Sequence, residues 1–248
     1  MRLILVMMII LGACSQLTSE NISLEPLIDD NWTTIASGLE EDTLRNGATI
    51  FQAVRIDPTQ YTFRAHYRPN APLTLAEWQA ELPTAEVIIN ANFFTPENTV
   101  LGLLITDGVR HGTSYTNRGA TFFVDGARVG IRSNTREPYQ SEAYSQAVQA
   151  FPMLVDDGLA TYNNSADTAI SRRTVIAQDS QGHIILMVTS GFGLSLYDLS
   201  QYLPITDLNI VDALNLDGGG STMMSVASSQ TTVISLDPVP IVLAVYPN

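Results

Sequence analysis

Short alternating segments joined by tight turns constrain the fold of this chain more than any other feature. Residues 60–67 alternate cleanly, with Tyr61, Phe63, Ala65 and Tyr67 on one face. Asp-Gly is a preferred dipeptide of two-residue hairpin turns, and it occurs at 107–108 and 125–126 between such segments. Three hairpins are therefore expected, from the paired segments 101–106 with 109–111, 120–124 with 127–131, and 173–178 with 183–189.

Helices are expected to be fewer. Thr74 and Glu77 have the spacing of a capping box ahead of Trp78 and Leu82. Residues 142–151 and 195–203 are two further candidates, and residues 208–214 fit either a helix end or a strand. These patterns predict an α+β fold with a largely antiparallel or mixed β-sheet core and a few surrounding helices.

The N-terminal residues predict export. Met1-Arg2 is a minimal basic region, and the uncharged apolar run of residues 3–11 is too short to span a bilayer. The sequence Leu11-Gly12-Ala13-Cys14 resembles the lipobox of bacterial lipoproteins, in which cleavage precedes a lipidated cysteine. The alternative is a buried apolar helix that carries a core cysteine. The resemblance implies a lipoprotein signal peptide at 1–13 and lipid on Cys14, the only cysteine.

The same resemblance implies a location and a domain plan. Ser15 stands where aspartate retains lipoproteins in the inner membrane, so we expect a lipid-anchored protein of the bacterial cell envelope, attached to the outer membrane. Residues 14–31 are polar and irregular and are interpreted as a tether. No linker or repeat divides the rest, which predicts one domain at 32–248.

Composition excludes several kinds of chemistry. All 12 basic residues are arginine, so neither a Schiff-base lysine nor a P-loop lysine is available. A formal net charge of −13 argues against a nucleic-acid partner, because such a surface repels a polyanion. An anionic ligand must therefore be met locally by a few arginines and backbone amides.

The strongest chemical motif is Asn215-Leu216-Asp217-Gly218-Gly219-Gly220-Ser221-Thr222. Three successive glycines are kept where the backbone needs positive φ or approaches another group closely. Asp217 can handle a proton, while the amides of Gly218–Gly220 and the hydroxyls of Ser221 and Thr222 can hold an oxyanion. A simple tight turn between core elements is the alternative.

Two other segments carry candidate binding residues. Residues 87–94 begin as a buried strand and end in Asn90, Asn92, Phe93 and Phe94, whose side chains either enter a cleft or cap their own backbone. Arg173 begins another strand and is the favoured fork for a phosphate or carboxylate, with Arg172 expected to face solvent. The carboxylates of Asp156 and Asp157 are expected to form a turn.

Metal and serine chemistry have weaker support. The three histidines, His66, His111 and His183, are far apart in the sequence and fit strand faces better than a metal site. Ser221 lacks the surrounding pattern of a nucleophile elbow. No cofactor is required as far as the sequence shows, although a divalent cation held by Asp217 and carbonyl oxygens stays open.

Together these segments resemble the phosphodiester glycosidase family over residues 46–246. The resemblance rests on 90–94, on Pro152, Leu154 and Asp157-Gly158, on Arg173-Thr174, on 215–222, and on Pro238-Val239-Pro240 before Ala244-Val245-Tyr246. Departures from the family's pattern are Ala91 or Asn92 in place of glycine, Arg172 in place of proline, Ala177 in place of glycine and Asp237 in place of arginine.

The resemblance implies an enzyme that hydrolyses a sugar-1-phosphodiester on exported glycans or glycoconjugates, releasing the sugar and a phosphomonoester. Asp217, Arg173 and Ser221 would be catalytic. Substrate would contact Asn90, Asn92, Phe93, Phe94, Gly218, Gly219, Gly220 and Thr222. The alternative is a non-catalytic envelope lipoprotein that binds glycans or sugar phosphates, since a fold does not fix a function.

Overall fold

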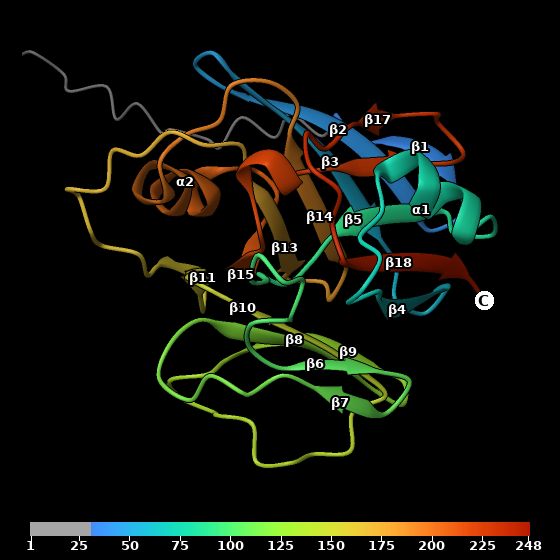
Figure 1. The fold of residues 1–248 in the computed structure, drawn as a ribbon. Coiled ribbons are helices and arrows are strands. Elements are labelled where there is room, and N and C mark those ends of the chain that lie inside the picture. The colour runs from blue at the N-terminus through green and yellow to red at the C-terminus, as the bar shows by residue number, and fades with distance from the viewer. Residues whose placement is uncertain (1–30) are drawn as a thin grey trace, which may run out of the picture.

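The computed structural model describes residues 31–248 of the chain, and these form three antiparallel β-sheets (Figure 1). The expected signal peptide, Cys14 and the tether up to residue 30 lie outside the described residues. Among residues 31–248, no helix has the length and apolar character needed to cross a bilayer.

The largest sheet has eight strands. Their order across the sheet is β1 (Thr33–Ala36), β2 (Leu39–Asn46), β3 (Thr49–Ile56), β14 (Ile184–Thr189), β13 (Thr174–Asp179), β15 (Ile210–Asn215), β11 (Met153–Asp156) and β12 (Leu159–Ala160). The segment at 208–214, left open between helix and strand, therefore contributes strand β15.

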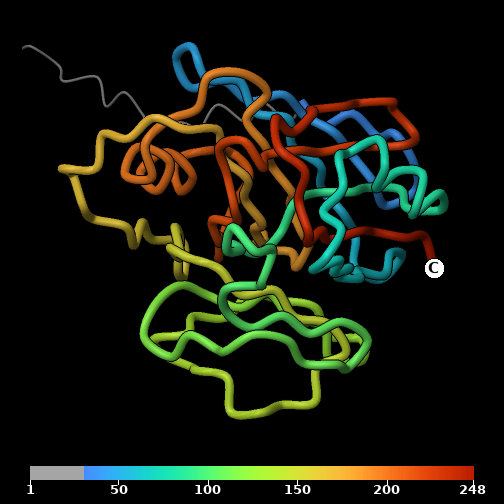
Figure 2. The backbone as a smooth tube through the Cα atoms, in the orientation of Figure 1, coloured from blue at the N-terminus to red at the C-terminus, as the bar shows by residue number. Residues whose placement is uncertain are grey.

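Each of the other two sheets has five strands. One runs in the order β7 (Val109–His111), β6 (Leu104–Thr106), β10 (Gln146–Ala150), β8 (Ala120–Asp125) and β9 (Arg128–Ser133). The other runs in the order β17 (Thr232–Val233), β16 (Met224–Val226), β5 (Val87–Asn90), β18 (Ile241–Pro247) and β4 (Tyr61–Tyr67). The sheet of β6–β10 is one continuous excursion of the chain, green to yellow at the bottom of Figure 2.

All three predicted hairpins are present, as β6 with β7, β8 with β9, and β13 with β14. In β4 the side chains of Tyr61, Phe63 and Ala65 are buried, as the alternation predicts. The helices are α1 (Leu75–Glu81), capped by Thr74 in a capping box, and α2 (Leu196–Tyr202), capped by Ser195. Two 3₁₀ turns are η1 (Leu203–Ile205) and η2 (Gly219–Ser221).

The helix expected at 142–151 is wrong, because β10 occupies its second half as a strand. Its residues Gln146–Ala150 are all buried between β6 and β8, so the segment shows no alternation that marks a strand. The fold is accordingly predominantly β, with two short α-helices in the described chain, and the expected α+β class holds only loosely.

The main hydrophobic core lies where the three sheets meet. It combines Val54 and Ile176 of the eight-stranded sheet with Phe122 of β8, Phe63 of β4 and Ile89 of β5. A second cluster packs α2 on the other face of the eight-stranded sheet, and a third packs α1 on β5 and β18. The ends of β5 and β15 and the start of β13 converge beside this core, which is where the polar motifs lie.

Candidate active site

The acidic glycine loop joins two of the sheets directly after β15. The Leu216 N–H donates to the Thr174 carbonyl at 2.9 Å, which extends the pairing of β15 with β13. The Asp217 N–H donates to the Ala91 carbonyl at 3.0 Å, just beyond the end of β5. These bonds fix the backbone of Asp217 before the chain turns through η2.

The three glycines are explained by close packing. A Cβ on Gly218 would lie 2.6 Å from the Arg172 carbonyl oxygen, and Gly219 has a φ of +62°. A Cβ on Gly220 would collide with the Asp237 carboxylate. The N–H groups of Gly219 and Thr222 donate to the carbonyls of Arg172 and Gly219, respectively. The Gly218 N–H donates to the Asp217 carboxylate, so two of the three glycine amides expected to face an oxyanion, those of Gly218 and Gly219, are engaged within the protein.

The Asp217 carboxyl is set apart from ordinary surface carboxylates. Burial raises its pKa above the usual value for aspartate, and the nearby charge of Asp237 raises it further. Hydrogen bonds from the Ser221 hydroxyl and the Gly218 N–H act in the opposite direction; the latter is 2.9 Å long. Asp217 and Ser221 are thus brought together, and a carboxyl with a raised pKa is suited to proton transfer.

Arg173 is buried next to this loop. Its Nε donates to the Leu194 carbonyl and its Nη2 to the Ala169 carbonyl, both at 2.8 Å. Burial lowers the pKa of its guanidinium, and within residues 31–248 it forms no salt bridge. The Asp167 carboxylate acts on it only from a distance beyond a salt bridge. A buried cation without a salt bridge is costly unless an anion binds beside it, which marks Arg173 as an anion-binding candidate.

Asp217 and Arg173 line the same cavity, which has a volume of about 320 Å³. Three other predicted site residues line it too: Phe93, Gly218 and Gly219. The remaining lining residues, none of which was expected to contact substrate, are Phe151, Pro152, Ser171, Leu196 and Asn215. The strand-end arginine and the acidic loop therefore converge on one cavity.

Asn215 is the most informative of the unassigned residues. Its side chain is buried, and its Nδ2 donates to the Phe151 carbonyl at 3.1 Å. Its Oδ1 is buried and accepts no hydrogen bond from any described residue. A buried acceptor of this kind calls for a donor, and a bound hydroxyl would supply one. The sequence signal was present, because Asn215 begins the acidic glycine motif.

Aromatic rings and a further arginine form another wall. The rings of Phe93 and Phe151 lie 4.8 Å apart, and Tyr115 meets Phe151 edge-on at 5.5 Å. The guanidinium of Arg118 lies 4.2 Å from the centre of the Phe151 ring and 4.4 Å from that of Tyr115. Arg118 is exposed, so the aromatic wall ends in a solvent-facing positive charge. Arg118 lies in a loop, where no sequence pattern identifies it as a residue near the site.

Contrary to the expectation that it contacts substrate, Asn90 does not line the cavity. Its Nδ2 donates to the Asp217 carbonyl at 2.6 Å, while its Oδ1 accepts from the Thr174 hydroxyl at 2.9 Å and the Met223 N–H at 3.0 Å. Thr222 is fully buried, 3.3 Å from the Thr174 hydroxyl. Both residues hold the acidic loop from behind, which corrects their expected contact with substrate.

Asn92, Phe94 and Gly220 also lie outside the cavity lining. The Asn92 Nδ2 donates to the carbonyls of Leu103 and Gln149 at 3.0 and 2.9 Å, because the strand end turns its side chain towards the sheet of β6–β10. Phe94 packs against the hydrophobic core. Arg172, the second of the paired arginines, is half-buried and donates to the Ile234 carbonyl at 3.0 Å.

The histidines and acidic clusters lie elsewhere. His66, His111 and His183 contact Tyr246, Thr106 and Asp179, respectively, and none of them lines the cavity. In the described chain, one group of carboxylates has oxygens within 4.8 Å of one another, and it consists of Asp156, Asp157 and Asp212. Arg136 forms ion pairs with the first two, and Asp157 occupies the β11–β12 turn with a φ of +52°. These residues form the expected turn.

Sequence comparisons show which protein family has a similar sequence over the residues of this site. A sequence model described as phosphodiester glycosidase matches residues 83–246, a range that contains every residue lining the cavity. A search of curated protein sequences gave no match.

Solved structures share the fold at low sequence identity. A hypothetical protein from Synechocystis superposes with a TM-score of 0.68 and 16% identity over 86% of this chain, which spans 63% of that protein. The catalytic domain of zebrafish N-acetylglucosamine-1-phosphodiester alpha-N-acetylglucosaminidase, auto-inhibited by its pro-peptide, superposes with a TM-score of 0.61 and 18% identity, covering 85% of this chain and 82% of the zebrafish chain.

Proposed function

Because the chain belongs to the phosphodiester glycosidase family, we propose that it hydrolyses a sugar-1-phosphodiester of an exported glycan or glycoconjugate. The products would be the free sugar and a phosphomonoester. The observation that carries the proposal is that a carboxyl with a raised pKa and a buried guanidinium without a salt bridge share one cavity. A carboxyl and a guanidinium in one cavity suit a reaction in which positive and negative charge develop on the two parts of the substrate.

The bond that breaks joins the anomeric carbon to the bridging phosphate oxygen, which keeps the electron pair. Positive charge develops on the sugar and negative charge on the phosphate. Water adds its hydroxyl to the anomeric carbon, and its proton passes to the Asp217 carboxylate. A phosphate leaving group needs little protonation, so one catalytic carboxylate suffices. The raised pKa of Asp217 brings it closer to neutral pH, as a general base requires.

Arg173 lines the cavity and is the cation nearest to the proposed phosphate position, and Arg118 adds a second positive charge over the Phe151 ring. Arg173 is held rigidly by two backbone carbonyls, so it offers its charge without reorganising when the phosphate departs. Arg118 sits at the end of the aromatic wall, where it is exposed. Loss of either charge would weaken stabilisation of the leaving group.

The aromatic side of the cavity suits a sugar. The rings of Phe93 and Phe151 offer an apolar wall for a sugar face, and the free Oδ1 of Asn215 offers an acceptor to a sugar hydroxyl. This role falls to Asn215 because it lines the cavity, whereas Asn90 and Asn92 do not.

A panel of sugar-1-phosphodiesters tests the proposal. The purified domain is incubated with each compound, and both reducing sugar and phosphomonoester are measured. Equal release of the two products from at least one compound is expected. Equilibrium binding with no product release from any compound would instead favour the non-catalytic sugar-phosphate-binding protein.

Lipid attachment at Cys14 is a separate proposal that rests on residues 1–15 alone. It would place the domain at the envelope membrane, in reach of exported glycoconjugates. Replacing Cys14 by serine should release the protein from the membrane fraction. Unchanged membrane attachment of that variant would refute the anchor and leave the proposed reaction untouched.

A further inference from the structure

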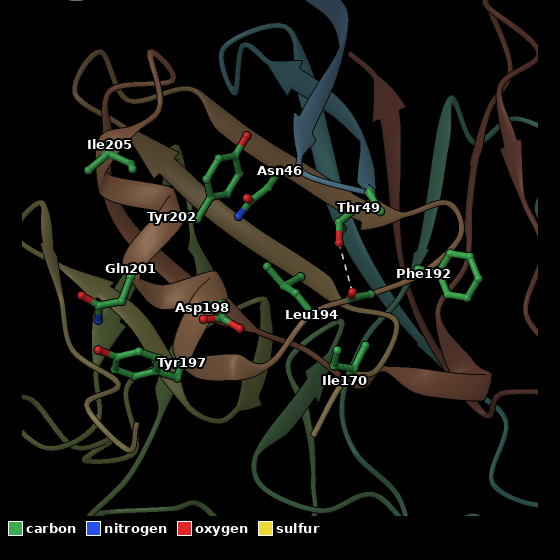
Figure 3. A pocket seen from close by; sticks show the side chains of 12 residues that line it. Asn46, Thr49, Ile170, Phe192, Leu194, Tyr197, Asp198, Gln201, Tyr202 and Ile205 are labelled. Atoms are coloured by element: carbon green, nitrogen blue, oxygen red, sulfur yellow. Dashed lines mark hydrogen bonds between the residues drawn. The ribbon is translucent and has the colours of Figure 1, made fainter. Parts of the chain in front are cut away.

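A second hollow, which we name the α2 groove, lies beside the candidate active site. Figure 3 shows it between α2 and the segments around Thr49 and Leu194. Its volume is about 600 Å³. Its main apolar lining consists of Ile170, Phe192, Leu194, Tyr197, Tyr202 and Ile205. The volume and the largely apolar lining with a few polar groups are those of a small-molecule site.

Large apolar side chains are unusually exposed along the α2 groove. The exposed fraction is 71% for Ile170, 81% for Phe192 and 81% for Ile205. Single exposed apolar residues are ordinary, but three around one hollow indicate that something apolar covers them. No arginine lines the groove, so it lacks the cation that a phosphate would need.

The α2 groove and the catalytic cavity share one wall. That wall is the antiparallel bridge between Ser171 and Leu194, closed by the Leu194 N–H to the Ser171 carbonyl at 3.1 Å. Ile170 lines the groove, whereas its neighbour Ser171 lines the cavity. Leu194 lines the groove, whereas Leu196 lines the cavity.

Arg173 is hydrogen-bonded to this shared wall. Its Nε donates to the Leu194 carbonyl and its Nη2 to that of Ala169, so the anion-binding candidate stands at the boundary between the two hollows. A phosphodiester has two ester arms. With the phosphate at Arg173 and the sugar towards Asp217, the other arm would have to pass over the Ser171–Leu194 bridge to reach the apolar groove.

We propose that the α2 groove binds the apolar alkyl or aryl alcohol of the substrate, so that the preferred substrates are sugar-1-phosphodiesters of hydrophobic alcohols. The inference rests on the proposed function, because it names the second arm of the same substrate. A polar arm would gain nothing from Ile170 and Phe192, whereas an alkyl arm removes their side chains from water.

The test compares the methyl and octyl diesters of one sugar 1-phosphate that the enzyme hydrolyses. For the wild type, kcat/KM for the octyl diester should exceed that for the methyl diester on the order of 10–100-fold, through KM. The double variant Ile170→Ser with Phe192→Ser removes the apolar side chains without adding a charge beside Arg173, so it should bring the ratio near one and leave the methyl diester unaffected. Both side chains are exposed, so the variant retains its core.

Leu159→Ser is the matched control, because Leu159 is 70% exposed but lines neither hollow. It should keep the wild-type ratio. An equal kcat/KM for the two diesters in the wild type, or an unchanged ratio in the double variant, would overturn the groove inference alone.

Binding separates this inference from the proposed reaction. Calorimetry with both diesters and the Asp217→Asn variant should show tighter binding of the octyl compound, lost when the groove substitutions are added. If the octyl diester binds more tightly than the methyl diester but the wild type hydrolyses neither, the proposed reaction is refuted and the groove inference stands. Co-sedimentation with phosphatidylethanolamine–phosphatidylglycerol vesicles tests a lipid surface as the occupant. If the groove variant no longer sediments with the vesicles but binds the octyl diester as the wild type does, the groove binds a lipid surface and the inference is overturned.

Discussion

Replacing Asn90 by alanine removes an amide that joins three segments behind the candidate active site. Its side chain bonds to the Asp217 carbonyl, the Met223 N–H and the Thr174 hydroxyl. The Thr174 hydroxyl can turn to Thr222, 3.3 Å away, but the two backbone groups are left without this partner. At about 1–3 kcal/mol for each buried polar group left unpaired, the free energy of unfolding should fall by about 2–6 kcal/mol.

That loss is a large part of the roughly 5–15 kcal/mol that stabilises an ordinary domain. Urea unfolding followed by tryptophan fluorescence measures it, with Asn163→Ala as a control at an exposed asparagine. Below the unfolding transition, kcat should fall because the Asp217 carbonyl loses one of the bonds that fix its backbone, while KM changes little.

A different result would refute this reasoning. If Asn90→Ala unfolds at the wild-type urea concentration and raises KM alone, Asn90 contacts the sugar instead of holding the loop. The combined measurement thus separates a positioning residue from a substrate-binding one.

Three further predictions concern the cavity itself. Arg173→Lys should lower kcat/KM on the order of 10²–10³-fold, because lysine cannot reproduce the fork that fixes the charge; kinetics equal to those of wild type would exclude the anion role. Asn215→Ala should raise KM for the full substrate. Among the 2-, 3- and 4-deoxy analogues, the one that lacks the hydroxyl bound by Asn215 should have the same KM with the variant as with the wild type, and an equal effect on all analogues would contradict the contact. Asp237→Asn removes a negative charge that raises the pKa of Asp217, so the acid limb of the kcat/KM profile should move to lower pH; an upward shift would be contrary to the assignment.

Local signals in the sequence predicted much of the fold. The Asp-Gly turns predicted β6–β9, and the capping pattern at Thr74 predicted α1. The helix expected at 142–151 failed because β10 is buried on every side, and a fully buried strand lacks the alternation on which strand prediction depends. How the three sheets pack was not available from any local pattern.

The candidate site was only partly predictable for a similar reason. The glycines and Asp217 carry their own signal, since close packing and charge are properties of the motif. Asn90 and Asn215 are the same residue type at strand ends, and only the fold determines which amide is consumed by backbone groups and which keeps a free acceptor. Arg118 reaches the aromatic wall through a loop, so its role depends entirely on tertiary contacts.

Burial of Asp217 has a consequence for stability as well as for catalysis. Its pKa is raised in the folded state, so the folded protein holds this proton to a higher pH than the unfolded chain does. The stability contributed by the protonated form is present below the unfolded pKa and is lost as pH rises through the raised folded pKa. Asparagine does not ionise, so the Asp217→Asn variant should melt at the wild-type temperature or above it at neutral pH.

The most direct test of the account measures turnover, binding and melting temperature on one preparation of Asp217→Asn. The account predicts that release of sugar from the best phosphodiester of the panel collapses, that the diester still binds, and that the melting temperature does not fall. Activity per folded molecule close to wild type, with a lower melting temperature, would show instead that Asp217 only holds its own turn and would contradict the proposed mechanism.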